Sequence, residues 1–314
     1  MAVLDGVAAP ARAARVRPRR ASRRERWLRR LPLLPALIYV VVVTQAPFVV
    51  TVWYSFQSYF WDIPGGAHFT GLSNYSTVFT DPAFRGSLLR SVIMTASAVI
   101  GAMILGVLLA VLLDRKFFGR GMARTLIITP FLVMPAAAAL IWAYPMLDAN
   151  YGLVNFLLAP FGVNHVAWLS TQPLLSVIIV MIWQWTPFMT LIVLAGLQSQ
   201  PPDTLEAAKV DGAGALATFR ELTIPHLRPY IELGVLLGSI YLVNTFDAVR
   251  LMTNGGPGTA TTNLPFYLYQ KVDYAYDIGG AAAAGVVTVV LTIIVATLAL
   301  RMFARVFRFE EARG

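Results

Sequence analysis

The stretch that decides the fold of this chain is "EAAKVDGAGALATFRELTIPHLRP", residues 206–229, a polar interval within a largely apolar sequence. We expect a helix of about two turns over Thr204–Val210. Gly212 tolerates a positive φ and predicts the turn at which this helix ends. A second short helix should run to about Leu222, because Pro225 prevents its continuation.

This predicted helix–turn–helix has two interpretations. Ala207 and Ala208 keep the first helix thin, and Leu216 and Phe219 give the second an apolar ridge. These features are consistent with an element that docks on another protein. An ordered loop that packs on its own helical bundle explains them equally well, so the residues alone leave both open.

The chain around this stretch reads as a membrane protein. Of its 314 residues, 57% are hydrophobic and only 13% are charged, a balance typical of polytopic membrane proteins. Six apolar stretches have the length that a helix needs to cross a bilayer. They are Leu31–Phe56, Ser91–Leu113, Leu126–Tyr144, Leu174–Leu197, Ile231–Met252 and Ala281–Phe303. The sequence therefore predicts an all-α protein with six transmembrane helices.

Two further patterns bear on these helices. Prolines interrupt the third predicted span at Pro130 and Pro135, where we expect kinks that neighbouring helices stabilise. Small residues recur every four positions in the second span, from Ala98 to Ala110, and in the sixth, from Gly280 to Ala296. Such ladders let helix backbones approach closely. We expect packing within the chain here, rather than a subunit interface.

The basic residues set the expected orientation. Of the 25 Lys and Arg residues, 21 lie in segments on one side of the predicted spans and four on the other. The positive-inside rule then predicts that both termini are cytoplasmic. We divide the chain into a basic tail (1–30), a transmembrane domain (31–305) that includes the polar loop 201–229, and a C-terminal tail (306–314). The arginine-rich tail is interpreted as a topology signal that touches anionic lipid, not as a nucleic-acid arm.

Several kinds of chemistry find no support in the sequence. Cysteine is absent, and the three histidines are far apart, which argues against a thiolate or His-rich metal site. No nucleotide-binding G-x-x-x-x-G-K-[ST] motif and no hydrolase motif occurs. We therefore expect no catalytic residues, no metal and no cofactor in this chain.

The polar loop resembles the EAA loop of ABC-importer permeases. That loop reads Glu-Ala-Ala, three residues, Gly, nine residues, Ile, one residue, Leu-Pro. Here Glu206-Ala207-Ala208 leads to Gly212, and nine residues later come Leu222, Ile224 and Pro225. Leu222 and Ile224 differ conservatively from the pattern. The fuller stretch is similar to the form found in sugar importers.

The resemblance implies a coupling helix that sits in a groove of a cytoplasmic ATPase. The residues that would carry this contact are Glu206, Ala207, Ala208, Asp211 and Gly212. Glu206 could pair with a basic residue of the ATPase. The implied partners are a second homologous permease, two ATP-binding subunits that hold ATP and Mg²⁺, and an external solute-binding protein, in the inner membrane of a bacterium.

A second stretch, Thr253–Val287, resembles the external loop and final helix of permeases related to the larger maltose-importer permease. It favours a carbohydrate or polyol as cargo. Two alternatives stay open: an ABC permease for a non-sugar solute, and an ion-coupled secondary transporter that uses Asp247. We detect no internal inverted repeat, which weakens the latter.

Polar residues inside predicted spans are candidates for a substrate path, because such residues usually face a bundle interior or a water-filled cavity. The candidates are Trp183, Gln184, Tyr241, Asn244 and Asp247. The last three are spaced by three residues and should share one face of span five. Aromatic rings beside hydrogen-bonding groups suit a sugar.

Structural roles could account for the same residues. Polar packing between helices explains Gln184 and Asn244, and tryptophans often anchor helices at the membrane interface. Asp247 could pair with Arg250, three residues further on, in a structural ion pair.

Overall fold

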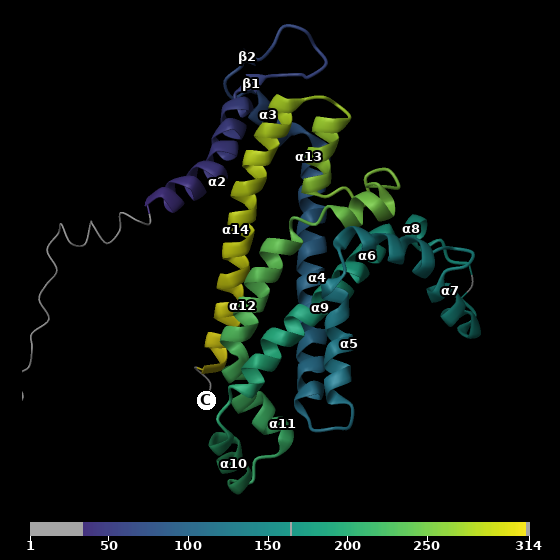
Figure 1. Ribbon diagram of the computed structural model, residues 1–314, viewed down its shortest axis with the longest axis vertical. Helices are drawn as coiled ribbons and strands as arrows, with labels where there is room; N and C mark the ends of the chain where they lie inside the picture. The colour runs from purple at the N-terminus through teal and green to yellow at the C-terminus, as the bar shows by residue number, and fades with distance from the viewer. Residues whose placement is uncertain (1–33, 164, 312–314) are drawn as a thin grey trace, which may run out of the picture. The chain divides into compact units, whose positions relative to one another are not determined.

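The computed structural model describes residues 34–163 and 165–311 (Figure 1). The chain divides into two compact units, and unit 2 begins at Thr51. Helix α2, Leu34–Ser55, is apolar and long enough to cross a membrane. The predicted basic tail, residues 1–30, lies outside the described residues.

Unit 2 is mostly helical within its described part. The elements that precede α9 are β1 (Gln57–Ser58), β2 (His68–Phe69), α3 (Ser73–Thr80), α4 (Pro82–Asp114), α5 (Arg120–Leu132), α6 (Pro135–Ile141), η2 (Trp142–Met146), α7 (Leu153–Leu158), η3 (Ala159–Phe161) and α8 (Trp168–Thr171). The remainder are α9 (Pro173–Gln198), α10 (Pro202–Val210), α11 (Ala215–Thr218), η4 (Phe219–Thr223), α12 (Ile224–Leu242), η5 (Val249–Thr253), α13 (Leu264–Asp273) and α14 (Ile278–Glu311). The two short strands pair antiparallel and are the exception to the predicted all-α class.

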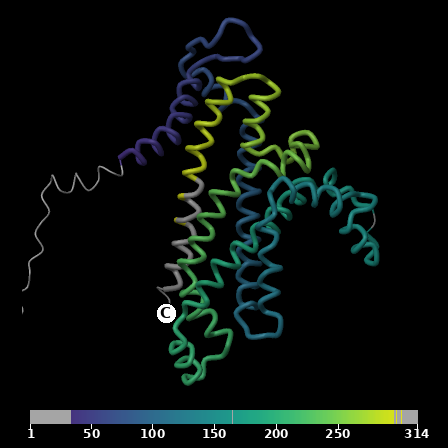
Figure 2. Tube along the Cα trace, in the orientation of Figure 1, coloured from purple at the N-terminus to yellow at the C-terminus, as the bar shows by residue number. Residues whose placement is uncertain are grey.

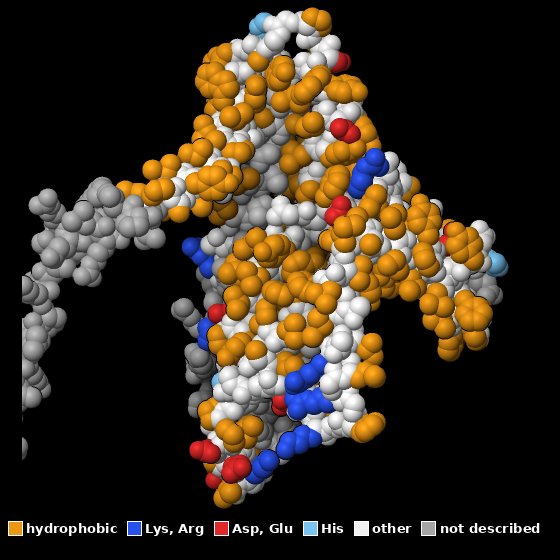
Figure 3. All heavy atoms as spheres, viewed as in Figure 1, with side chains coloured by type: hydrophobic (Ala, Val, Ile, Leu, Met, Phe, Trp, Pro, Cys, Tyr) orange, Lys and Arg blue, Asp and Glu red, His pale blue; other side chains and the backbone are white. Residues whose placement is uncertain are grey.

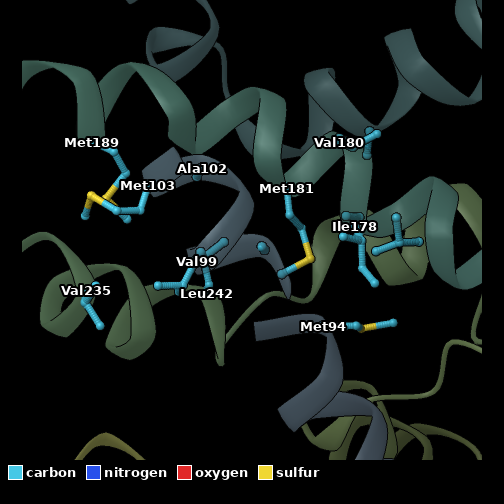
Figure 4. Packing of buried hydrophobic residues seen from close by; sticks show 14 of the residues in the cluster. Met94, Val99, Ala102, Met103, Ile178, Val180, Met181, Met189, Val235 and Leu242 are labelled. Carbon is cyan, nitrogen blue, oxygen red and sulfur yellow. The ribbon is translucent and has the colours of Figure 1, made fainter. Parts of the chain in front are cut away.

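The core of unit 2 lies between α4, α9 and α12, which run side by side (Figure 2). Gly106 of α4 packs so tightly on α9 that an added Cβ would lie 2.6 Å from the Cβ of Met189. Met189 in turn points toward Met103 (Figure 4), and both methionines contact the open face of Gly234 on α12. Small residues thus bring three backbones together, and flexible thioethers fill the space between them.

The small-residue ladder of α4 is buried within the chain. Ala98, Ala102 and Ala110 have no exposed surface, and Gly106 is also buried. The prediction that this ladder serves packing inside the chain, and not a subunit interface, is therefore confirmed for α4.

The spans are less regular than the sequence predicts. Within the described residues, three helices are long and apolar enough to cross a membrane: α2, α4 and α9. A fourth candidate is the pair formed by α5 and the continuous α6–η2 segment, whose axes meet at 99°. The prediction of one kinked helix over Leu126–Tyr144 is wrong, because the chain leaves helical geometry at Val133 and Met134.

The fifth predicted span also differs from its expected form. Helix α12 ends at Leu242, and the backbone is non-helical over residues 243–246 before η5 begins. Pro225 does not end the second short helix either. It lies in the first turn of α12, and α11 continues through the π-helix η4 into α12. Proline is tolerated in the first turn of a helix, because the backbone N–H that it lacks would have no partner within the helix there. The wider π turn accommodates the proline ring.

Hydrogen bonds of Asp81 join the start of α4 to α13. Asp81 caps α4 by accepting a hydrogen bond from the backbone N–H of Ala83 at 2.8 Å. The hydroxyl of Tyr267 on α13 donates to the second oxygen of the same carboxylate at 2.6 Å. Burial acts to raise the pKa of Asp81, but these two hydrogen bonds, the positive charge of Lys271 and the backbone N–H of Phe84 together hold that pKa below its ordinary value.

Candidate functional site: a projecting helical loop and two broken helices

The polar loop folds as a projecting helical element at one end of unit 2 (Figure 1). Figure 3 shows acidic and basic side chains gathered at this end, whereas apolar side chains cover much of the flanks. Glu206, Ala207 and Asp211 are exposed, and Ala208 is buried beneath them. Val210 is 87% exposed, which gives the element an apolar contact surface beside its charges.

Gly212 forms the turn that the sequence predicts. Its φ is +79°, a conformation that glycine adopts without strain. The N–H of Ala213 donates to the carbonyl of Ala208 at 2.9 Å, and the N–H of Gly212 donates to that of Lys209 at 3.1 Å. This is the hydrogen-bond pattern of a Schellman motif, and it fixes the direction in which α10 ends.

The loop is attached to the core by a joint between the end of α9 and the start of α12. The Ser199 hydroxyl lies 2.8 Å from the Tyr230 hydroxyl and 3.0 Å from Nε2 of His226. An added Cβ at Gly196 would lie 2.7 Å from Tyr230 and from Leu227. Polar contacts and close backbone packing therefore join the end of α9 to the start of α12 at the base of the loop.

A side chain of α9 supplies a hydrogen-bond donor to the backbone at the break between α5 and α6. Nε2 of Gln184 donates to the carbonyl of Val133 at 3.0 Å, and this carbonyl lies at the point where the helix stops. Gln184 thus makes a polar contact between segments, which was one of its two interpretations from the sequence. The neighbouring Trp183 packs edge-on against Trp142 of η2, with ring centroids 5.6 Å apart.

An aromatic cluster lies beside the same break. Trp185 is 5.6 Å from Phe131, 5.4 Å from Phe188 and 5.5 Å from Tyr241, measured between ring centroids. The Tyr241 side of the cluster is open, because this residue is 61% exposed. Phe131 and Phe188 were not among the predicted site residues, although the spacing of Trp185 and Phe188 by three residues places both on one face of a helix.

The prediction that Tyr241, Asn244 and Asp247 share one helical face is wrong. Helix α12 ends at Leu242, so Asn244 lies in the turn that follows it and Asp247 begins the next helical segment. Asn244 is exposed, and its Nδ2 donates to the carbonyl of Ile240 at 2.7 Å. Its side chain therefore stabilises the end of α12.

The alternative ion pair between Asp247 and Arg250 is also wrong. Nη1 of Arg250 donates to Oδ1 of Asn254 at 2.5 Å. The guanidinium lies over the ring of Tyr269, 5.3 Å from its centroid. Among the described residues, Asp247 and Arg250 form no salt bridge.

The second break, after α12, has its own amide donor. Nδ2 of Asn263 donates to the carbonyl of Thr245 at 2.5 Å, and its Oδ1 accepts from the N–H of Phe266 at 3.1 Å. Asn263 therefore donates to a carbonyl at the break after α12, and the same side chain caps α13. η5, which follows this break, packs on α6 and η2, which follow the first break. The two broken helices thus meet beside α9.

Comparisons with known proteins agree with this arrangement. Residues 102–308 match the family described as "Binding-protein-dependent transport system inner membrane component". The chain belongs to this family. The resemblance inferred from the polar loop is therefore confirmed, and the protein is a transport permease subunit rather than an enzyme.

Two curated relatives are similar to this permease over most of their length. A probable ABC transporter permease protein, y4oQ of Sinorhizobium fredii, is 40% identical over 86% of this chain and 88% of its own. The trehalose/maltose transport system permease protein MalF of Thermococcus litoralis is 35% identical over 90% of this chain and 96% of its own.

A solved structure shares the fold. It is that of a bacterial alginate ABC transporter in complex with a pentasaccharide-bound periplasmic protein. One of its chains aligns with a TM-score of 0.75 and 20% identity, covering 90% of the permease and 96% of that chain. The permease is accordingly an inner-membrane component with several apolar helices.

Proposed function

We propose that this permease carries a carbohydrate or polyol across the inner membrane in an importer driven by ATP hydrolysis in separate subunits. The observation that carries the proposal is the exposed α10–Gly212–α11 element, which presents the family's motif residues at one end of the core. The cargo class rests on the Thr253–Val287 resemblance and on similarity to a trehalose/maltose permease.

In this proposal α10 is the coupling helix. Glu206, Ala207, Asp211 and Gly212 contact a groove of the ATPase, and the exposed Val210 fills its apolar part. Ala208 supports the contact from beneath, because it is buried and its carbonyl holds the Gly212 turn. Movement of the ATPase then reaches α9 and α12 through Ser199.

The assembly follows from the same family. A second homologous permease, two ATP-binding subunits and an external solute-binding protein complete the importer. Six spans, with both termini cytoplasmic, place α10 and the ATPase on the same side of the membrane. In this scheme the two broken helices count as spans three and five, because each resumes after its break.

The cargo path runs along the open side of the aromatic cluster. Tyr241 and Trp185 offer ring faces on which a sugar can stack, and the exposed Asn244 offers its amide oxygen to a hydroxyl. The half-buried Asp247 is a further acceptor. Trp183 and Gln184 hold the geometry of the path through Trp142 and Val133 rather than contacting cargo.

Reconstituted transporter with Glu206→Lys tests the coupling. We expect the permease to assemble, and ATP hydrolysis to lose its stimulation by loaded solute-binding protein, because the substituted side chain repels the basic partner of Glu206. Glu206→Gln, which keeps the shape and removes only the charge, should give an intermediate loss. Normal stimulation in the lysine variant would contradict the docking assignment.

Uptake into vesicles separates the classes of transporter. Uptake of a radiolabelled sugar that requires internal ATP and persists without an ion gradient supports the proposal. Uptake driven by a proton or sodium gradient without ATP would favour the ion-coupled alternative.

The proposed topology has its own test. A reporter fused after Gly314 should be active only in its cytoplasmic form, and one inserted near Gly162 only in its external form.

A further inference from the structure

The short turn between α4 and α5 carries an unusual pair of exposed aromatic residues. Phe118 is 104% exposed and Phe117 is 46% exposed. Both lie at the end of unit 2 that also carries α10 and α11, and α10 reaches beyond them (Figure 1). Neither the coupling helix nor the cargo path accounts for this pair.

The length of α4 places the turn near the boundary of the bilayer. The apolar stretch Ser91–Leu113 rises about 35 Å at 1.5 Å per residue, close to the roughly 30 Å of a hydrocarbon core. The residues after it therefore lie at the level of the lipid headgroups. Exposed apolar side chains continue on both sides of the turn, at Leu112 of α4 and Met122 of α5.

The charges of the turn are strongly positive. Arg115 and Lys116 precede the two phenylalanines and are exposed. The neighbouring carboxylate, Asp114, lies 3.8 Å from the guanidinium of Arg120, whose Nε also donates to the carbonyl of Leu113. Among the described residues neither Arg115 nor Lys116 forms a salt bridge, so both charges are available to an anion.

A third cation lies one turn further along α5. Nε and Nη2 of Arg124 are buried and have no hydrogen-bond partner among the described residues. Buried donors without a partner are costly. Because these two nitrogens are buried, Arg124 adds positive charge beside the turn without offering them to an external ligand.

We propose that this turn anchors the permease to anionic phospholipid of the cytoplasmic leaflet. Phe117 and Phe118 insert below the headgroups, and Arg115 and Lys116 bind the headgroup charges. An apolar tip flanked by two exposed cations matches an anionic lipid surface better than it matches a protein groove. The leaflet, but not the anchoring itself, rests on the orientation proposed above.

Because the chain has no cysteine, one introduced thiol in the permease can report on the turn. Gly121→Cys lies one turn from Phe118, is exposed, and has open space around its Cβ. Gly214→Cys, in the coupling element, is equally exposed and open and serves as the matched control. The complete transporter is labelled with an NBD fluorophore in nanodiscs that contain doxyl-labelled lipid, with the unsubstituted transporter as the labelling background.

We expect doxyl lipid to quench the fluorophore at position 121 at least about twofold, and to leave the one at 214 unquenched. Replacing Phe117 and Phe118 with serine should reduce quenching at 121 to the level at 214. If position 121 is unquenched, the anchor is refuted. If it is also shielded from aqueous iodide, a protein partner covers the turn instead.

The headgroup preference is tested by titrating phosphatidylglycerol into phosphatidylcholine nanodiscs and following the emission at position 121. Replacing Arg115 and Lys116 with serine should raise the half-maximal phosphatidylglycerol fraction by about fivefold for each residue. An unchanged midpoint refutes the anionic preference. Reduction of the fluorophore at position 121 by dithionite in sealed vesicles assigns the leaflet. An external location overturns both the leaflet and the proposed orientation. The anchor itself is decided by the quenching alone.

Discussion

Replacement of Gly212 with valine should destabilise the proposed coupling element locally without disturbing the core. The φ of +79° lies in the left-handed region, which costs an L-residue about 1–2 kcal/mol and a β-branched one at least as much. An added Cβ would meet nothing within 4 Å. The whole penalty is therefore conformational and falls on the turn that ends α10.

The penalty can be measured at two backbone amides. The N–H groups of Ala213 and Gly212 close the turn by donating to Ala208 and Lys209. A cost of about 1–2 kcal/mol makes local opening about 5- to 30-fold more frequent. Hydrogen exchange of a peptide covering residues 202–216 should accelerate by that factor, and stimulation of ATP hydrolysis by loaded binding protein should fall.

Two variants control for side-chain size and for position. Gly212→Asn should retain most of the protection, because asparagine tolerates the left-handed region. Gly214→Ser should be neutral, because Gly214 has a φ of −69°, caps α11 and has open space around it. Equal exchange and equal stimulation in the Gly212→Val and Gly214→Ser proteins would refute the reasoning.

Three other predictions concern the candidate site and the hydrogen bonds of Asp81. Gln184→Leu should lower the free energy of unfolding by about 1–3 kcal/mol, seen as a lower Tm in detergent, because the carbonyl of Val133 loses its donor; an unchanged Tm would contradict this. Asn244→Ala should raise the sugar concentration for half-maximal uptake with basal ATP hydrolysis preserved, and unchanged uptake would place the cargo site elsewhere. The lowered pKa of Asp81 means that its contribution to stability is present at neutral pH and is lost as pH falls below about 4. Asp81→Asn should therefore unfold more readily than the native protein at pH 7, and this difference should shrink toward pH 3, whereas Tyr267→Phe should reproduce part of the loss.

Local chemistry in the sequence was sufficient to predict the turn of the α10–Gly212–α11 loop. Glycine at position 212 predicts a left-handed turn because few other residues adopt it without strain, and that turn is present. The four-residue ladder of α4 likewise predicts close packing, and Gly106 lies against α9. The turn depends only on residues within a few positions. The ladder is also a local pattern, although it does not specify that α9 is the helix it packs against.

The breaks in the third and fifth predicted spans were decided only by the tertiary structure. An apolar run has the same composition whether its helix is continuous or bent by 99°. A break is stable only where another segment supplies a donor to the freed carbonyl. Val133 receives its donor from Gln184, 51 positions away, and Thr245 receives one from Asn263, 18 positions away. No local pattern contains such pairings, and they determine where Tyr241, Asn244 and Asp247 lie.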